Sequence, residues 1–367
     1  MARGNITVLV GGQYGSEGKG AIVRHIAFDY NVHVRVGSPN AGHTFYWNGE
    51  KHVQQSIPCG WINPFATIVV GRGALLNMKQ LMKELVHVMS YDPDFLRRLK
   101  IDAKAGVLSE KFHEQEGGVN GEMHRRIGST GEGVGPARIA RLERDPEKFH
   151  LFEEVAEEWG LSQCVTENTP KMLAEMQDSG NDILIEGTQG SGLSLLHSHW
   201  PYCTSIDTNA AGIISEVGIA PSRVTDVLMV VRTFPIRVAG NSGPMVNEIT
   251  WKELDEKWLH GHVEPEKTTV TKKVRRIAEW DQSLYEQSVL LNAPTSLALT
   301  FADYIDPELF SCDDIEIVNS SEKLNEFIDS KPGLRPLLRF IGTGPNSVAD
   351  VQPTRRENAM VKEEGNN

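Results

Sequence analysis

Residues 11–20 read Gly-Gly-Gln-Tyr-Gly-Ser-Glu-Gly-Lys-Gly. The apolar run 6–10 before them is typical of a buried strand, and apolar side chains recur at helical spacing over residues 21–27. A glycine-rich turn between a strand and a helix favours phosphate binding, because backbone N–H groups can surround an anion and the helix N-terminus adds partial positive charge. The sequence therefore predicts a phosphate-binding loop in which Lys19 supplies a full charge.

This loop departs from the standard pattern Gly-x-x-x-x-Gly-Lys-[Ser/Thr] at two places. Gln13 stands where the first glycine belongs, and Gly20 replaces the hydroxyl residue after the lysine. A metal ion carried by a nucleotide must therefore find its protein ligands elsewhere, and Ser16 is the nearest candidate. A glycine-rich turn without a ligand is the alternative, but five glycines, a lysine and suitable flanking elements together favour the phosphate loop.

The composition limits the function classes. The chain has 367 residues, 40% of them hydrophobic, and a formal net charge of −12, which argues against nucleic acid or an anionic membrane as partner. Its four cysteines show no metal-binding or disulfide spacing, and no run approaches the roughly 18 apolar residues of a membrane span. We expect a cytoplasmic protein with one large domain over residues 1–352 and a charged, mobile tail over 353–367.

Alternation of strands with helices predicts an α/β fold with a mainly parallel central sheet and flanking helices. Asn77 is expected to cap a helix over 78–89. Ligands of such sheets gather beyond the carboxyl ends of the strands, where glycine-rich segments recur in this chain. Further strands are expected at 32–36, 68–70, 183–186, 224–231, 297–301 and 337–341.

Seven motifs, in order from residue 8 to about residue 345, resemble the adenylosuccinate synthetase family, which has a P-loop-related fold. That family reads Gly-Asp-Glu-Gly-Lys-Gly where this chain has serine at position 16, and it reads Asn-Ala-Gly-His-Thr at residues 40–44. The family's aspartate is its general base and a magnesium ligand. The resemblance thus implies a C–N ligase that uses Mg²⁺, held here by Ser16 and the carbonyl of Gly42.

The resemblance also assigns roles to single residues. His43 is implied as the general acid, and Gln189 is implied to face the purine O6, where negative charge builds. Arg138 and Arg141 compete for the arginine that the family donates across a homodimer interface. The implied catalytic residues are Ser16, Lys19, His43 and Gln189. The residues implied to bind the substrate nucleotide are Ser16, Asn40, Ala41, Ser129, Thr130, Arg138, Arg141, Gln189, Thr204, Val238 and Gly240.

The basic segment 268–276 is either a solvated charge run or, by resemblance, the loop that binds the aspartate substrate. Its implied ligands are Thr269, Val270, Thr271, Lys273 and Arg275. The phosphate donor is implied to contact Gly15, Ser16, Glu17, Gly18, Lys19, Gly20, Gly42, His43, Thr44, Arg275, Asp303, Gly342, Thr343, Gly344 and Pro345. Phe301 replaces the lysine that supports guanine in the family, and its ring is expected to lie against adenine, so ATP or dATP is the expected donor.

Serine at position 16 resembles the bacteriophage 2-aminoadenylosuccinate synthetases within this family. The implied substrates are dGMP and L-aspartate, joined through a 6-phosphoryl intermediate. An ordinary synthetase acting on IMP with GTP, and a non-catalytic nucleotide-binding protein, are the two alternatives. The preference for deoxyribose, and the group that takes the N1 proton (Glu17 or a metal-bound water), stay open from sequence.

Overall fold

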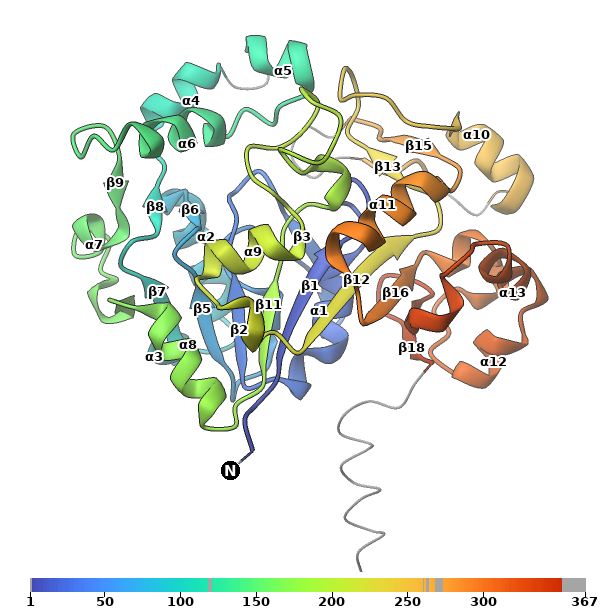
Figure 1. Ribbon diagram of the computed structural model, residues 1–367, viewed down its shortest axis with the longest axis horizontal. Coiled ribbons are helices and arrows are strands. Elements are labelled where there is room, and N and C mark those ends of the chain that lie inside the picture. Colours follow the sequence, from blue (N-terminus) through green and yellow to red (C-terminus); the bar gives the residue numbers. More distant parts are fainter. Residues whose placement is uncertain (1, 118–120, 260, 262–263, 268–272, 352–367) are drawn as a thin grey trace, which may run out of the picture.

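The computed structural model describes residues 2–117, 121–259, 261, 264–267 and 273–351 (Figure 1). The predicted mobile tail and the predicted ligands Thr269, Val270 and Thr271 lie outside the described residues. None of the described helices combines the length and the apolar character needed to cross a membrane.

A central sheet of ten strands has the order β10-β7-β5-β2-β11-β1-β12-β16-β17-β18 within the part of the chain that the structure describes. Neighbouring strands are parallel except for β17 and β18, which are antiparallel. The strands are β1 (Ile6–Gly11), β2 (Val32–Arg35), β5 (Thr67–Val70), β7 (Leu99–Asp102), β10 (Val165–Thr166), β11 (Ile183–Glu186), β12 (Asp226–Arg232), β16 (Ser296–Thr300), β17 (Leu338–Gly342) and β18 (Val348–Asp350).

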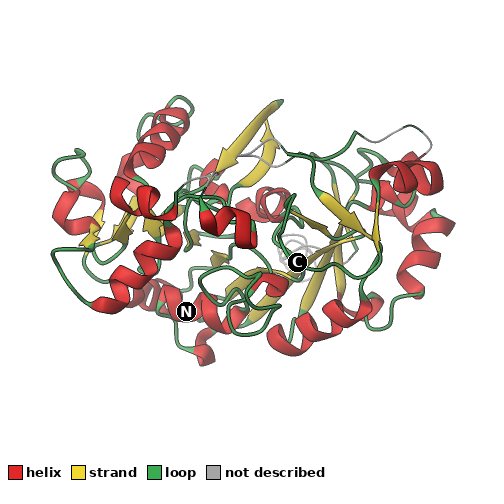
Figure 2. Ribbon diagram, turned by 90° about the horizontal axis from the view of Figure 1, so that it is seen from above, coloured by secondary structure: helices red, strands yellow, loops and turns green. Residues whose placement is uncertain are grey.

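Helices cover both faces of this sheet, as Figure 2 shows from above. Strand β1 is buried along its whole length, and its alternate side chains enter different cores: Val8 and Val10 join one, and Leu9 joins the other. The core around Leu9 includes apolar residues of α1 (Lys19–Ile26) and α2 (Met78–Met89), whereas the opposite core includes residues of α8 (Thr169–Asp178), α9 (Ala210–Val217) and α11 (Gln282–Asn292). The loops after β1 therefore start from a rigid, fully buried strand.

The remaining helices are α3 (Phe95–Arg98), α4 (Glu110–Glu116), α5 (Glu122–Ile127), α6 (Val134–Glu143), α7 (Phe152–Val155), α8 (Thr169–Asp178), α9 (Ala210–Val217), α10 (Trp251–Leu254), α11 (Gln282–Asn292), α12 (Ile315–Ser320) and α13 (Glu322–Asp329). Smaller sheets are formed by β3 (His43–Trp47) with β4 (Glu50–Gln54), by β6 (Leu75–Leu76), β8 (Gly106–Val107) and β9 (His150–Leu151), and by β13 (Ile236–Arg237), β14 (Glu248–Ile249) and β15 (Arg276–Ala278).

The α/β class and the mainly parallel sheet predicted from sequence are confirmed, and strand ends shift by one or two residues. Strand β16 stops at Thr300 because Phe301 has a φ of 60°, in the left-handed region that breaks a strand. Helix α2 has the predicted bounds, and the side chain of Asn77 accepts a hydrogen bond from the backbone N–H of Gln80.

Candidate active site

The glycine-rich loop between β1 and α1 is organised by its own carboxylate. Glu17 Oε1 accepts hydrogen bonds from the backbone N–H groups of Gln13 (3.0 Å) and Gly15 (2.7 Å), and Oε2 lies 2.6 Å from Lys19 Nζ. Both charged side chains are fully buried. The Lys19 charge is thus paired inside the loop. The N-terminus of α1 has no side-chain cap, so its first N–H groups suit an anion.

Two arginines hold Ser16, the residue at the position of the family's aspartate. Arg275 Nη1 donates to Ser16 Oγ at 2.9 Å, and Arg232 Nη1 donates to the Ser16 carbonyl at 3.1 Å. Arg232 also pairs with Glu266 at 2.5 Å. An uncharged hydroxyl therefore sits beside a guanidinium, which would attract an anionic group at this place.

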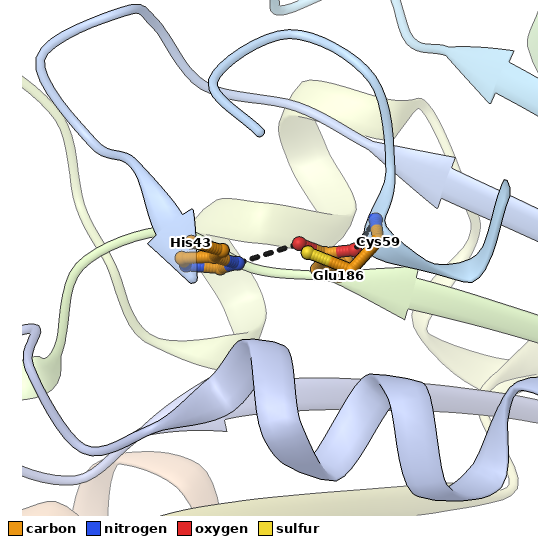
Figure 3. A group of neighbouring side chains, drawn as sticks. All are labelled: His43, Cys59 and Glu186. Atoms are coloured by element: carbon orange, nitrogen blue, oxygen red, sulfur yellow. Dashed lines mark hydrogen bonds and ion pairs between the residues drawn. The ribbon is translucent and has the colours of Figure 1, made fainter. Parts of the chain in front are cut away.

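His43 is fixed by a carboxylate from the centre of the sheet (Figure 3). Its Nδ1 lies 2.5 Å from Glu186 Oε1 at the end of β11 and 2.9 Å from Arg35 Nη1. Burial lowers the pKa of His43 to about 4, and the charge of Arg35 acts in the same direction. Burial alone would raise the pKa of Glu186, but Arg35 and His43 outweigh it and lower the pKa to about 2. The other ring nitrogen of His43, Nε2, is buried without a hydrogen-bond partner among the described residues.

His43, Cys59 and Glu186 form a group with metal-ligand chemistry among the described residues. Glu186 is already engaged, since Oε2 accepts from the Cys59 backbone N–H at 2.7 Å and Oε1 pairs with Arg35. Burial raises the pKa of the Cys59 thiol well above its usual value, which disfavours the thiolate that binds metals. The group is therefore better suited to orienting His43 than to holding an ion.

A cavity with a mixed polar and apolar lining joins this region to the predicted nucleotide site. It brings together thirteen residues singled out from the sequence: Gly15, Ser16, Asn40, Ala41, Gly42, His43, Ser129, Thr130, Gln189, Thr204, Val238, Lys273 and Arg275. Gln189 adopts a φ of 64°, unusual for a residue with a side chain, and its Nε2 donates to Thr204 Oγ1 at 3.3 Å. The strained backbone turns the amide toward the cavity wall that Thr204 forms.

Glu116, a buried residue at the end of α4, positions the turn at Ser129 and Thr130 through hydrogen bonds. Glu116 accepts from the Ser129 hydroxyl and from the backbone N–H of Gly133. His124 Nδ1 contacts the Ser129 carbonyl, and His124 Nε2 lies 3.4 Å from Lys273 Nζ. His124 therefore links the predicted phosphate turn to the basic loop.

The residues predicted to bind the donor base lie outside this cavity. Thr343 is fully buried and donates to the Cys312 carbonyl, and Asp303 is buried in the turn after β16. The Phe301 ring has the Arg232 guanidinium 3.7 Å above it. One ring face is thus covered by a cation, and stacking of adenine against the ring stays a prediction for the other face. Gly240, Thr44 and the segments 17–20 and 342–345 are likewise absent from the cavity wall.

Comparison with protein families identifies the chain. The adenylosuccinate synthetase family model matches residues 8–158 and 140–333. The chain belongs to the adenylosuccinate synthetase family. The synthetase of Methanococcus maripaludis is 35% identical over 346 residues, covering 92% of this chain and 96% of that protein, and the synthetase of Thermococcus sibiricus is 35% identical over 345 residues, covering 92% and 95%. This synthetase is therefore a C–N ligase.

Solved structures agree with this assignment. The succinoaminodeoxyadenylate synthetase of cyanophage S-2L, solved with dGMP and with dATP as energy donor, is 28% identical, with a TM-score of 0.79 and 99% of both chains covered. The adenylosuccinate synthetase of Plasmodium falciparum is 21% identical, with a TM-score of 0.80, covering 95% of this chain and all of that one. The second likeness concerns the fold alone.

Arg138 and Arg141 of the synthetase do not reach the cavity. On α6, Arg138 pairs with Glu216 at 2.8 Å and donates to the Gly73 carbonyl at 3.1 Å. Arg141 donates to the Lys104 carbonyl at 3.1 Å. Neither arginine lines the cavity of its own chain. That one of them reaches the nucleotide site of a second subunit across a dimer interface stays a prediction.

Sequence reasoning missed four residues that hold the site. In the sequence, Arg35 and Glu186 are strand residues without an assigned role, and Glu116 and His124 belong to none of the motifs. A charged residue within an otherwise apolar strand was the available signal for the first pair, since a buried charge needs a partner. The second pair leaves no local signal, because its partners are a mixture of backbone groups and the side chains of Ser129 and Lys273, which belong to no shared sequence pattern.

We expect Glu186→Gln to lower kcat about 100-fold, toward the low end of a general acid's contribution, with KM values changed much less. The amide cannot orient and charge-stabilise the imidazole as the carboxylate does. Steady-state kinetics measure the split. Asp102→Asn is the matched control, since Asp102 is another buried carboxylate paired with an arginine, Arg72. Equal kcat for the two variants would show that Glu186 has only a structural role.

Proposed function

We propose that this synthetase joins L-aspartate to C6 of dGMP, with ATP or dATP as phosphate donor, and releases ADP (or dADP) and phosphate. The product is N6-succino-2-amino-2′-deoxyadenylate, a precursor of 2-aminoadenine. The observation that carries the proposal is Ser16 in the cavity wall, where the family's aspartate stands. The likeness to the cyanophage enzyme, whose structure contains dGMP and dATP, supports it.

The first step attaches phosphate to the purine. O6 attacks the γ-phosphorus, the bond to the bridging oxygen breaks with its electron pair leaving on ADP, and the N1 proton is released to the solvent. His43 Nε2 and the Gln189 amide then stabilise charge on O6. His43 alone is neutral at pH 7, but the phosphates of two bound nucleotides bring negative charge, which favours its protonated form.

The second step exchanges phosphate for aspartate. The amine adds to C6, the C6–O6 bond breaks, phosphate leaves with the electron pair, and the amine proton passes to the departing phosphate or to the solvent. Lys273 and Arg275 border the same cavity and offer positive charge to the aspartate carboxylates. Thr269 and Thr271 are proposed partners from the sequence.

The cavity offers Mg²⁺ few protein ligands. Ser16 Oγ and the Gly42 backbone lie in one wall, so a hydroxyl and a carbonyl would hold the ion together with phosphate oxygens and water. Bound Mg²⁺ would neutralise charge on the β- and γ-phosphates. Glu17, the carboxylate next to Ser16 in the sequence, is committed to Lys19 and to loop N–H groups and is not free to bind the ion.

The proposed enzyme is a cytoplasmic homodimer in which an arginine of one subunit reaches the nucleotide bound to the other.

The relatives of Methanococcus maripaludis and Thermococcus sibiricus favour a second candidate, an ordinary synthetase that acts on IMP with GTP. Phosphate release with aspartate, ATP and either dGMP or IMP distinguishes the two. A clear preference for dGMP supports the proposal, and a preference for IMP refutes it.

We also expect ATP or dATP to support turnover better than GTP. Phe301 stands where the family has a lysine that supports guanine. Arg232, which lies over the Phe301 ring, is already paired with Glu266, so its charge does not replace that lysine. Initial rates with the three donors at saturating dGMP and aspartate give the comparison. A kcat/KM for GTP equal to or above that for ATP would contradict this expectation.

A further inference from the structure

Arg237, at the end of β13, is a buried cation that forms no ion pair with a carboxylate among the described residues; its exposed fraction is 3%. Its Nη1 donates to the Pro244 carbonyl at 3.0 Å, and its Nη2 donates to the Tyr202 carbonyl at 2.9 Å. Its Cζ lies 4.4 Å from the centre of the Tyr14 ring. Two carbonyls and a ring satisfy the guanidinium without neutralising it. Because buried charges are usually paired, this position is suited to an anion that enters from outside the chain.

Other buried arginines of this chain do have such a partner. Arg35 and Arg232, each 1% exposed, both form ion pairs with carboxylates. The partner of Arg35 is Glu186, and that of Arg232 is Glu266 at 2.5 Å. The positive charge of Arg237 therefore distinguishes its position within the fold.

Arg237 lines the cavity beside residues proposed to hold the substrate nucleotide. Thr204 follows Tyr202 in the loop that Arg237 contacts, Val238 comes directly after Arg237, and both line the same cavity. Gly243 allows these segments to meet, since a Cβ there would lie 2.6 Å from Tyr202 Cβ and 2.9 Å from Arg237 Nη2. The guanidinium thus joins the two loops that carry Thr204 and Val238.

Three cations line this cavity among the described residues: Arg237, Lys273 and Arg275. Lys273 and Arg275 belong to the basic segment proposed to meet the aspartate carboxylates, and Arg275 already contacts Ser16. Arg237 is therefore the cation that remains for the other anionic group expected in the cavity, the phosphate of the substrate nucleotide.

We propose that Arg237 is the cation with which this chain binds the 5′-phosphate of its substrate nucleotide. Its charge attracts the phosphate, while its hydrogen bonds to the Tyr202 and Pro244 carbonyls keep the guanidinium in place. The inference rests on the proposed function only in requiring a nucleoside monophosphate as substrate, so it applies equally to dGMP and to IMP.

The test compares the binding of dGMP with that of deoxyguanosine, which lacks the phosphate, by calorimetry on the wild-type, Arg237→Gln and Arg237→Lys enzymes. Glutamine can still donate to a carbonyl but carries no charge, and lysine keeps the charge. In Arg237→Gln we expect dGMP binding to weaken about ten-fold or more relative to deoxyguanosine binding, and Arg237→Lys should keep most of the wild-type ratio. A purely structural role would weaken both probes alike, so an unchanged ratio in Arg237→Gln overturns the inference.

Arg98→Gln is the matched control. Arg98 also donates to backbone carbonyls and lies over an aromatic ring, that of Phe95 at 4.8 Å, but it pairs with Asp92 and does not line the cavity. The ratio of dGMP to deoxyguanosine binding should be unchanged in this variant. An equal loss in Arg98→Gln and Arg237→Gln would overturn the inference, because it would not depend on a charge in the cavity.

Phosphorus NMR gives a second measurement that needs only the wild-type enzyme. A neighbouring cation favours the dianion, so the phosphate of bound dGMP should titrate at lower pH than that of free dGMP, whose second pKa is about 6. A pKa at or above that of free dGMP overturns the inference even if Arg237→Gln does not fold. An enzyme that prefers IMP would refute the proposed function, whereas the same comparisons with IMP and inosine would still test Arg237.

Discussion

Replacing His43 with alanine is expected to lower kcat by about 10²–10⁴-fold while leaving dGMP binding largely intact. His43 lines the cavity, its Nε2 has no hydrogen-bond partner among the described residues, and a positioned general acid contributes about this much. Phosphate release measures turnover, and calorimetry with dGMP measures binding.

The design of this experiment must separate chemistry from folding. Removing the ring leaves Glu186 with Arg35 and the Cys59 N–H as partners, so the buried carboxylate stays paired. His150→Ala is the matched control, because His150 is exposed and its ring pairs with Glu154 at 2.9 Å, away from the cavity. Near-native turnover of His43→Ala would mean that the histidine is merely a residue of the β3 strand.

Replacing Ser16 with aspartate is expected to shift the substrate preference from dGMP toward IMP. A general base worth about 10²–10⁴-fold is missing at this position, so the wild-type enzyme should use IMP poorly. Guanine differs from hypoxanthine by a 2-amino group beside N1, and the shorter serine leaves room for it and accepts its hydrogen bond. The structure adds a reason, since Arg275, 2.9 Å from Ser16 Oγ, would pair with a new carboxylate and hold it in the cavity.

Kinetics with dGMP, GMP and IMP on the wild-type and Ser16→Asp enzymes decide the matter. Ser16→Ala is the control, since it removes the hydroxyl without adding charge, and it should lower dGMP use without improving IMP use. A wild-type preference for IMP would make the serine a neutral replacement in an ordinary synthetase. Glu17 is a poor candidate for the N1 base, because its carboxylate faces Lys19 and the loop N–H groups.

Much of the site could be predicted because each ligand-binding segment follows its own strand. Apolar runs in the sequence predict the strands β1, β11 and β16, and glycine-rich segments predict loops at one edge of a parallel sheet. Ser16, His43 and Gln189 were therefore expected together, and all three line one cavity. The strand end at Phe301 was misjudged by one residue, since a positive φ at an aromatic residue has no local sequence signal.

The amino-acid sequence by itself determined the fold class, the family and the order of the binding segments, because apolar periodicity and short motifs are local properties of the chain. Only the tertiary structure decided how the charges are used. It turned Glu17 onto Lys19, placed Glu186 between Arg35 and His43, and paired Arg138 with Glu216 away from the cavity. Glu186 lies 143 residues beyond His43. Partners that distant meet only when the sheet assembles, and burial then forces each charge to find one.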